Sequence, residues 1–417
     1  MTGFDADLVR PFAALRPAPG RAGDVAAPPY DVMNADEARL LAEGRPFSFL
    51  HVSRAEIDLA PETDPCAPEV YATAARNLKS FEASGALIRD TSPCFYVYRM
   101  TTADACQTGV AVSASVDAYN ANRIRKHELT RPAKEDDRAR QIEAVQAITG
   151  PVLLVNRADP DLASLLEAAT TAEPVADVED GGVVRHQVWR VSDAERIVAI
   201  ARCINTMDAL YIADGHHRSA AAARIAEARR AGASRDDGNA RWNGFLAVSF
   251  PDNELTILDY NRVVRDLNGR DPAAFLKALS ANFHIRPSDV PVRPLEPHSY
   301  GMYLEGRWVL LSPRLPVEET DPVERLDVRV LDRTILAPLL GIDDPRTNAR
   351  IDFIGGSRGV DAVAARVDTG EMAVGFTLFP TSLADLMAVA DAGEIMPPKS
   401  TWFDPKLADG LLSLPLD

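Results

Sequence analysis

The most constraining feature of this 417-residue sequence is an apolar run that stops at one glycine and continues as an alanine-rich segment. Residues 209–214 (ALYIAD) have the apolar character of a short buried strand, and Gly215 interrupts the pattern. Residues 216–230 (HHRSAAAARIAEARR) consist largely of strong helix formers. We predict a strand, a tight turn and a helix that begins directly after Gly215.

The start of this predicted helix is an anion-binding site on physical grounds. The first N–H groups of a helix have no partner within the helix, and the helix dipole places about half a positive charge there. An anion such as phosphate meets those donors directly. It would also meet the turn glycine and the side chains of the first helical turn: Gly215, His216, His217, Arg218 and Ser219.

Asp214 directly precedes the glycine, and the sequence is consistent with two roles for it. Its carboxylate either caps the helix, or helps to hold a divalent cation beside a bound phosphate. A zinc site is disfavoured, because adjacent histidines on a helix point about 100° apart. Helical zinc sites place their two histidines four positions apart, and the motif has no second histidine at that spacing.

A second polar cluster lies in residues 124–132 (IRKHELTRP). The HEL run is like the start of a zinc-protease signature, but Arg131 stands where that signature needs its second histidine. One carboxylate, Glu128, remains among cations, next to His127. It is either a general base for a hydroxyl or a member of an exposed ion-pair cluster. The surrounding cations are expected to compensate phosphate charge: Arg125, Lys126 and Arg131.

Weaker candidates lie elsewhere in the chain. Tyr30 and Asp31 follow two prolines in APPYDV (27–32), a rigid loop that either lines a pocket or turns the chain. Asn261 and Arg262 lie on a strand in YNRVV (260–264). We expect these four residues to contact substrate. The usual phosphate and esterase loops, GxxxxGK[ST], GxGxxG after a strand and GxSxG, are absent.

Composition limits the function classes. The net charge of −16 argues against a nucleic-acid-binding surface, because phosphate backbones select basic patches. No run approaches the roughly 18 apolar residues of a membrane span, and no secretory signal begins the sequence. The four cysteines form no CxxC pair. We therefore expect a cytoplasmic protein with no membrane or nucleic-acid partner; its oligomeric state is open.

Strands and helices alternate along the chain, which predicts a mixed α/β (α+β) fold. We expect an N-terminal core over 1–268 and a mixed α/β region over 269–417 that either packs into the same unit or forms its own. Two hairpins are predicted, one within 300–312 and one that joins 242–250 to 254–264. Further helices and strands are expected at 67–84, 94–100, 108–116, 131–148, 151–156 and 193–205.

Six blocks together resemble a large bacterial and archaeal family described only as a domain of unknown function. They are APPYDV, RKHELTRPAKEDDR, ADGHHRSAAA, YNRVV, IDFIGG and MPPKST, and they extend over nearly the whole chain. Through its DGHHR block this family is similar to the ParB/sulfiredoxin superfamily. The resemblance implies a ParB/sulfiredoxin-like phosphate-binding core that is elaborated with extra mixed α/β segments.

One branch of that superfamily contains free serine kinases, which phosphorylate the hydroxyl of L-serine with a glutamate as base. Sulfiredoxin needs a cysteine where this chain has His216, and ParB proteins need a basic DNA-binding region that is missing here. The resemblance therefore implies a small-molecule kinase with ATP, ADP or diphosphate as donor and Mg²⁺ as cofactor. The catalytic residues would be Glu128, His127 and Asp214. A phosphometabolite-binding sensor and a phosphatase or nucleotide hydrolase are the alternatives.

Overall fold

The computed structural model describes residues 7–181, 183–233, 238–317 and 319–417. The chain forms two compact units, one of residues 1–255 with 405–417, and one of residues 256–404. This division differs from the expected one at residue 268 in two ways. The boundary lies at Leu255, and the last thirteen residues return to the first unit.

The first unit is built on a mixed sheet whose order is β6-β11-β8-β12-β5-β4-β10-β9, with β1 also paired to β5. The pairs β11·β6 and β12·β8 are parallel, and the other neighbours are antiparallel. The strands are β1 (Val9–Arg10), β4 (Phe95–Thr101), β5 (Cys106–Ser115), β6 (Ile124–Arg125), β8 (Val152–Asn156), β9 (Ala176–Asp180), β10 (Val184–Val191), β11 (Leu210–Asp214) and β12 (Gly244–Pro251).

Helices pack on this sheet and on one another. Helix α9 (His216–Gly232) contacts β8, β12 and α5 (Val116–Asn120), and it lies along α6 (Pro132–Val145). Helix α7 (Pro160–Ala169) contacts β5 and β10, and α8 (Ala194–Asn205) contacts α7 and β1. The alanines of α9 make the close approach possible, because Ala221, Ala222 and Ala226 are at most 1% exposed.

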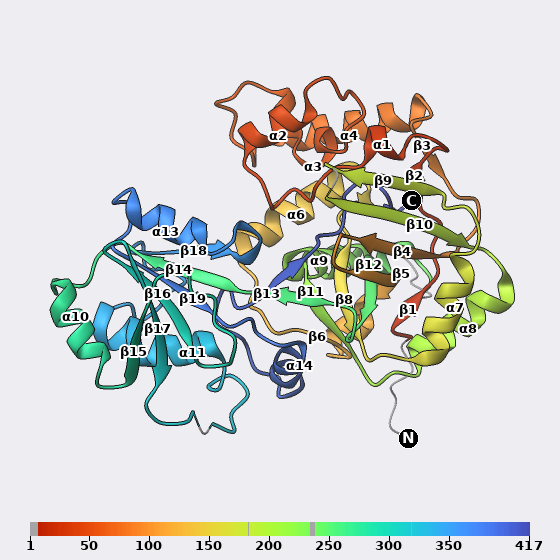
Figure 1. The fold of residues 1–417 in the computed structure, drawn as a ribbon. Coiled ribbons are helices and arrows are strands. Elements are labelled where there is room, and N and C mark those ends of the chain that lie inside the picture. Colours follow the sequence, from red (N-terminus) through yellow and green to blue (C-terminus); the bar gives the residue numbers. More distant parts are fainter. Residues whose placement is uncertain (1–6, 182, 234–237, 318) are drawn as a thin grey trace. The chain divides into compact units, whose positions relative to one another are not determined.

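The N-terminal segment adds a helical cluster to the first unit (Figure 1). Its own apolar core includes Phe49, Leu50 and Phe81. Asn34 and Glu37 form a capping box at the start of one of its helices. Its elements are β2 (Leu15–Pro17), α1 (Ala22–Val25), α2 (Ala35–Ala42), α3 (Leu50–Ser53), α4 (Pro68–Ala83) and β3 (Leu87–Arg89).

The last segment of the chain closes the first unit. Its strand β21 (Leu414–Pro415) pairs with β7 (Ala147–Ile148), which follows α6. Further upstream, Asp409 and Ala27 exchange backbone hydrogen bonds of 2.9 and 3.1 Å. The segment therefore brings its side chains next to the loop that contains Tyr30.

The second unit has a fully antiparallel sheet in the order β15-β17-β16-β19-β14-β18. Its strands are β14 (Tyr260–Val264), β15 (Phe283–Ser288), β16 (Tyr300–Leu304), β17 (Arg307–Pro313), β18 (Ile351–Gly355) and β19 (Val374–Leu378). Its helices are α10 (Pro272–Leu279), α11 (Asp327–Leu331), α12 (Ala337–Leu340), α13 (Asp361–Asp368) and α14 (Leu383–Asp391). A separate pair, β13 (Thr256–Leu258) with β20 (Trp402–Asp404), lies where the chain enters and leaves this unit.

The mixed α/β class is confirmed, and one predicted hairpin is wrong. Strand β12 pairs with β5 and β8, so both of its edges are already bonded inside the first unit. The following strands pair elsewhere, β13 with β20 and β14 with β18 and β19. The hairpin within 300–312 is present as β16 and β17. Within the described residues, no helix is both long and apolar enough to cross a membrane.

Candidate functional site

The predicted strand, turn and helix are present at the residues expected. Strand β11 ends at Asp214, Gly215 has a φ of 101°, and α9 begins at His216. A Cβ atom on Gly215 would lie 3.0 Å from Nε of Arg218 and 3.3 Å from Cα of Val152. The turn therefore requires glycine both for its left-handed backbone and for the space around it.

Asp214 does not cap the helix, since Gly215 is the N-cap and no side chain caps it. Its Oδ2 instead lies 3.3 Å from Nη2 of Arg218 and 3.2 Å from Nζ of Lys406. Burial alone would raise the pKa of Asp214, but these two cations hold the pKa well below its usual value. Asp214 is therefore a fixed negative charge at the end of β11.

Lys406 is a site residue that the sequence analysis missed. It reaches Asp214 across 192 residues of sequence, from the C-terminal segment that returns to the first unit. No local pattern around a single lysine indicates such a contact. The segment around it, residues 405–417 (PKLADGLLSLPLD), is rich in leucine, which indicates burial but names no partner for the lysine.

Arg218 is buried and links several groups around the helix start. Its Nη1 donates to the carbonyl of Pro151, and its Nη2 lies 4.0 Å from Oδ2 of Asp31 as well as close to Asp214. Burial would lower the pKa of Arg218, but Asp214 and Asp31 raise it above its ordinary value. Arg218 is therefore charged at every physiological pH and is held in place on two sides.

The two adjacent histidines clamp the loop of residues 126–131 onto α9. The main-chain N–H of His127 donates to Nε2 of His216 at 3.5 Å, and that of Arg131 donates to Nε2 of His217 at 3.0 Å. The rings of His127 and His216 also meet edge to face, with centroids 4.5 Å apart. Because the two side chains diverge around the helix, they accept hydrogen bonds from the loop at two residues that are four positions apart.

The clamp brings Glu128 to the start of α9. Its Oε2 lies 3.7 Å from Nδ1 of His216, while 48% of the Glu128 side chain stays exposed. Burial lowers the pKa of His216 well below its usual value, so the ring is neutral at neutral pH. Since Nε2 of His216 accepts a hydrogen bond, we assign the ring proton to Nδ1, which points it toward the carboxylate.

His127 is buried, and burial lowers its pKa to about 4. Within the described part of the chain its Nδ1 has no hydrogen-bond partner. Neither His127 nor His216 is therefore a cation at neutral pH. The positive charge around the helix start comes from arginine and lysine side chains.

The three cations predicted beside Glu128 lie in different settings. Nη1 of Arg125 donates to the hydroxyl of Tyr211 at 3.3 Å, and the guanidinium also lies over the ring of Tyr211. Nζ of Lys126 is 4.2 Å from the centre of the Tyr119 ring, and burial lowers the pKa of Lys126. Arg131 is exposed, next to the clamp. Ser219 is fully buried and donates to the carbonyl of His216 at 3.0 Å.

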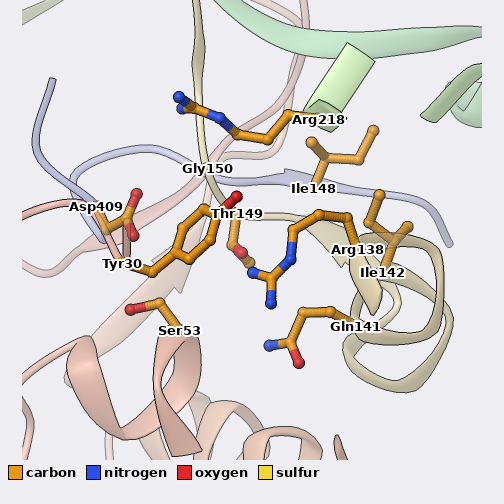
Figure 2. A pocket seen from close by; sticks show the side chains of 10 residues that line it. All are labelled: Tyr30, Ser53, Arg138, Gln141, Ile142, Ile148, Thr149, Gly150, Arg218 and Asp409. Carbon is orange, nitrogen blue, oxygen red and sulfur yellow. The ribbon is translucent and has the colours of Figure 1, made fainter. Parts of the chain in front are cut away.

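A small pocket adjoins Arg218, and Tyr30 is one of its walls (Figure 2). The guanidinium of Arg138 stacks on the Tyr30 ring at 4.1 Å, and burial raises the pKa of the Tyr30 hydroxyl. Asp31, the next residue, is the one that approaches Arg218. The pocket is lined by Tyr30, Ser53, Arg138, Gln141, Ile142, Ile148, Thr149, Gly150, Arg218 and Asp409. Arg138 and Asp409 were not among the predicted site residues.

The other two predicted substrate contacts belong to the second unit, on β14. Asn261 is fully buried, donates to Oδ2 of Asp259 at 2.6 Å and accepts from the N–H of Leu378 at 3.1 Å. Arg262 donates to the carbonyl of Lys399 at 3.0 Å, and burial lowers its pKa to about 10. The hydrogen bonds of both side chains stabilise the second unit.

The described residues contain no group of side chains that is arranged to bind the expected Mg²⁺. Among the described residues, no three His, Cys, Asp or Glu side chains are grouped to hold a metal ion. Asp214, the expected carboxylate, is already bound by Lys406 and Arg218. These residues do not fit a directly bound metal ion.

Several solved structures are similar to this chain at low identity. A conserved hypothetical protein from Pyrococcus furiosus is 15% identical, with a TM-score of 0.34 and coverage of 72% of this chain and 94% of that one. A free serine kinase in complex with AMP is 12% identical, with a TM-score of 0.34 and coverage of 71% and 86%. SbnI with C-terminal truncation from Staphylococcus aureus is 12% identical, with a TM-score of 0.39 and coverage of 73% and 87%.

No curated protein sequence matches the chain. A family match extends over most of it and confirms the resemblance to a domain of unknown function. Residues 9–329 match the family described as "Protein of unknown function (DUF1015)", and the chain belongs to that family.

Proposed function

We propose that this protein is a phosphotransferase that moves a phosphoryl group from ATP, ADP or diphosphate to the hydroxyl of free L-serine. The observation that carries the proposal is the position of Glu128. A half-exposed carboxylate lies 3.7 Å from a neutral histidine at the start of α9, where phosphate is expected to bind. The proposed base therefore lies beside the proposed anion site.

In the proposed reaction the terminal phosphate of the donor sits against the first-turn N–H groups of α9. Arg218 and Lys406 add positive charge, and phosphoryl transfer depends chiefly on such charge and on positioning. Glu128 accepts the proton of the serine hydroxyl while the hydroxyl oxygen forms its bond to phosphorus. The bond between phosphorus and the donor's bridging oxygen breaks, and the shortened donor leaves with that oxygen.

His216 and His217 act in this scheme mainly through position. Their Nε2 atoms hold the loop that contains Glu128, and Nδ1 of His216 faces the carboxylate. A neutral His216 does not form an ion pair with Glu128, so it does not lower the basicity of that carboxylate.

A hydrolase is the second candidate, and the exposure of Glu128 favours it. A carboxylate that is 48% exposed is open to water, which can replace serine as the nucleophile. A phosphometabolite sensor is the third candidate; it would bind the donor and need no base at position 128.

The test is to assay Glu128→Gln with each donor in the presence of L-serine and in buffer alone. Loss of a general base typically lowers kcat by about 10²–10⁴-fold, whereas donor affinity should stay within a few-fold of the wild type. Phosphorus NMR separates phosphoserine from free phosphate and so distinguishes the kinase from the hydrolase.

Glu167→Gln is the matched control, because Glu167 is an exposed glutamate of the same unit that pairs with Arg99. It should leave turnover unchanged. If Glu128→Gln turns over as fast as the wild type, Glu128 is not the general base. Donor binding without any turnover in the wild type identifies a sensor.

A further inference from the structure

Asp409 is a buried carboxylate for which the mechanism above has no use. It is 1% exposed, and its Oδ1 has no hydrogen-bond partner among the described residues. Ser53 lines the same pocket, and its hydroxyl also lacks a partner there. Figure 2 shows the Asp409 carboxylate beside Tyr30, in the pocket to which Arg218 also belongs. Buried polar atoms without partners are uncommon and indicate a missing ligand or water.

The charges around the pocket indicate the sign of that ligand. Arg138 is engaged by Asp137, with Nη2 and Oδ2 2.7 Å apart. Arg218 is engaged by Asp214 and approached by Asp31. Each guanidinium group therefore forms an ion pair with a carboxylate, whereas the carboxylate of Asp409 has no ion pair of its own in the described structure. The group that the pocket lacks is a cation.

The size of the pocket and its hydrogen-bond acceptors favour a small ammonium group as this cation. The cavity is about 30 Å³, which is enough for one water-sized group. An ammonium group is of that size and carries three hydrogen-bond donors, which Asp409 and Ser53 can accept. A divalent metal ion needs more carboxylate ligands than Asp409 alone supplies, and no such cluster exists in the described chain.

Arg218 connects this pocket with the phosphate site. It lines the pocket and also bonds to Asp214 at the start of α9. A ligand whose ammonium occupies the pocket therefore has its remaining atoms near the helix start. The acceptor of the proposed reaction, L-serine, carries its ammonium two carbons from its hydroxyl.

We propose that Asp409 binds the ammonium group of the phosphoryl acceptor and thereby selects amino alcohols over hydroxy acids. This inference rests on the proposed function for the identity of the acceptor. The binding of the ammonium can nevertheless be measured without turnover. Asp409 is then the residue that determines acceptor specificity, and Glu128 is the base.

The experiment is isothermal titration of the full chain at pH 8 with three compounds: L-serine, ethanolamine and 3-hydroxypropionate. The first two carry an ammonium and the third does not. The wild type should bind L-serine and ethanolamine, and should bind 3-hydroxypropionate at least tenfold more weakly than L-serine. Asp409→Asn should weaken the binding of L-serine at least tenfold and should not alter the binding of 3-hydroxypropionate.

The matched control is Asp90→Asn, which also removes a buried carboxylate, but one held by Arg16 and Tyr96. It should lower the thermal midpoint and leave the affinity for L-serine unchanged. Unchanged serine binding by Asp409→Asn, or a wild type that binds none of the compounds or binds all equally, overturns the inference. Serine binding that depends on Asp409 without phosphoryl transfer supports the inference and refutes the proposed kinase activity.

Discussion

Two aspartates near Arg218 are both buried, yet their pKa values shift in opposite directions. Asp214 contacts two cations, and its pKa is held below its usual value although burial opposes this. Asp409 has no such partner, and burial raises its pKa to about 7, although Arg218 partly opposes the shift. At neutral pH, Asp214 therefore always carries its charge, and Asp409 is close to its point of half-ionisation.

The raised pKa of Asp409 gives a testable effect on stability. In the unfolded chain an aspartate titrates near pH 3.9, so between about pH 4 and 7 folding keeps a proton on Asp409 that the unfolded chain loses. The stability from this group is therefore full at low pH and is lost as the pH rises toward 7. Asp409→Asn should be about as stable as the wild type at pH 4.5. At pH 8 it should be more stable, by an amount on the order of a few kcal/mol, since each pKa unit corresponds to about 1.4 kcal/mol.

Urea unfolding of both proteins at the two pH values measures this difference. Asp31, Tyr30, Arg138 and Arg218 face Asp409 from the neighbouring elements, and they are identical in the two proteins. Their contributions therefore cancel in the comparison. A gap between the two proteins that does not widen from pH 4.5 to pH 8 contradicts the prediction.

Single residues of the site were predictable to the extent that they lie in one motif. The glycine, histidines and arginine at 215–218 have local spacing that predicts a helix start, and they lie there. Lys406 and Asp409 were not predictable, because they reach the site from the end of the chain, and sequence periodicity contains no information about such distant contacts. The roles of the histidines were also underdetermined, since a histidine that accepts a main-chain hydrogen bond has the same local sequence as one that binds phosphate.

At the scale of elements, the site is a loop held on a helix. The loop between β6 and α6 contains Glu128, and its main chain is bonded to α9 at His127 and Arg131. The loop has no regular hydrogen-bonded structure of its own at residues 126–131. The position of the proposed base therefore depends on two histidine side chains of another element.

Removal of one of the two histidine hydrogen bonds should make this loop more mobile. His217→Ala deletes the acceptor for the Arg131 N–H, so hydrogen exchange at residues 127–131 should become faster while α9 stays protected. We expect kcat to fall about tenfold, because a loosely held base is often misplaced. The affinity for the donor should change less than kcat does.

His217→Gln is the informative companion variant, because its side-chain oxygen can still accept the Arg131 hydrogen bond. It should restore most of the exchange protection and part of kcat. If His217 acts only as a phosphate ligand, His217→Ala will instead weaken donor binding and leave exchange in the loop unchanged.

Elements were predicted from sequence where the local signals were strong. The alanine-rich α9 and the hairpin of β16 and β17 are both present. The hairpin expected after β12 is not formed, although residues 252–254 do form a turn. Turn chemistry predicts that the chain reverses, but it cannot tell which strand each edge will finally pair with.

At the scale of the molecule, the second unit is an insertion into the first. The chain leaves after Leu255 and returns at Pro405. The two flanking strands β13 and β20 are antiparallel neighbours, with Thr256 opposite Asp404. The ends of the insertion therefore lie side by side. The returning segment supplies Lys406 and Asp409 to the site, and its leucines at 407, 411, 412, 414 and 416 are at most 5% exposed.

This topology predicts that the second unit can be replaced by a short linker. A chain in which residues 256–404 are exchanged for a few Gly and Ser residues should fold, because both ends of the gap are already adjacent. It should unfold in a single cooperative transition and keep the Asp409-dependent binding of L-serine. The matched comparison is a chain that stops at residue 255 and lacks the returning segment.

The shorter chain should lose its cooperative transition, because it leaves the apolar surface beneath residues 407–416 uncovered and β7 unpaired. Circular dichroism and urea unfolding of the two chains measure the contrast. If neither chain folds, the first unit needs the second for its stability, and the division of the molecule into an inserted and a host unit is wrong. If both fold equally well, the C-terminal segment contributes residues to the site without stabilising the unit that holds it.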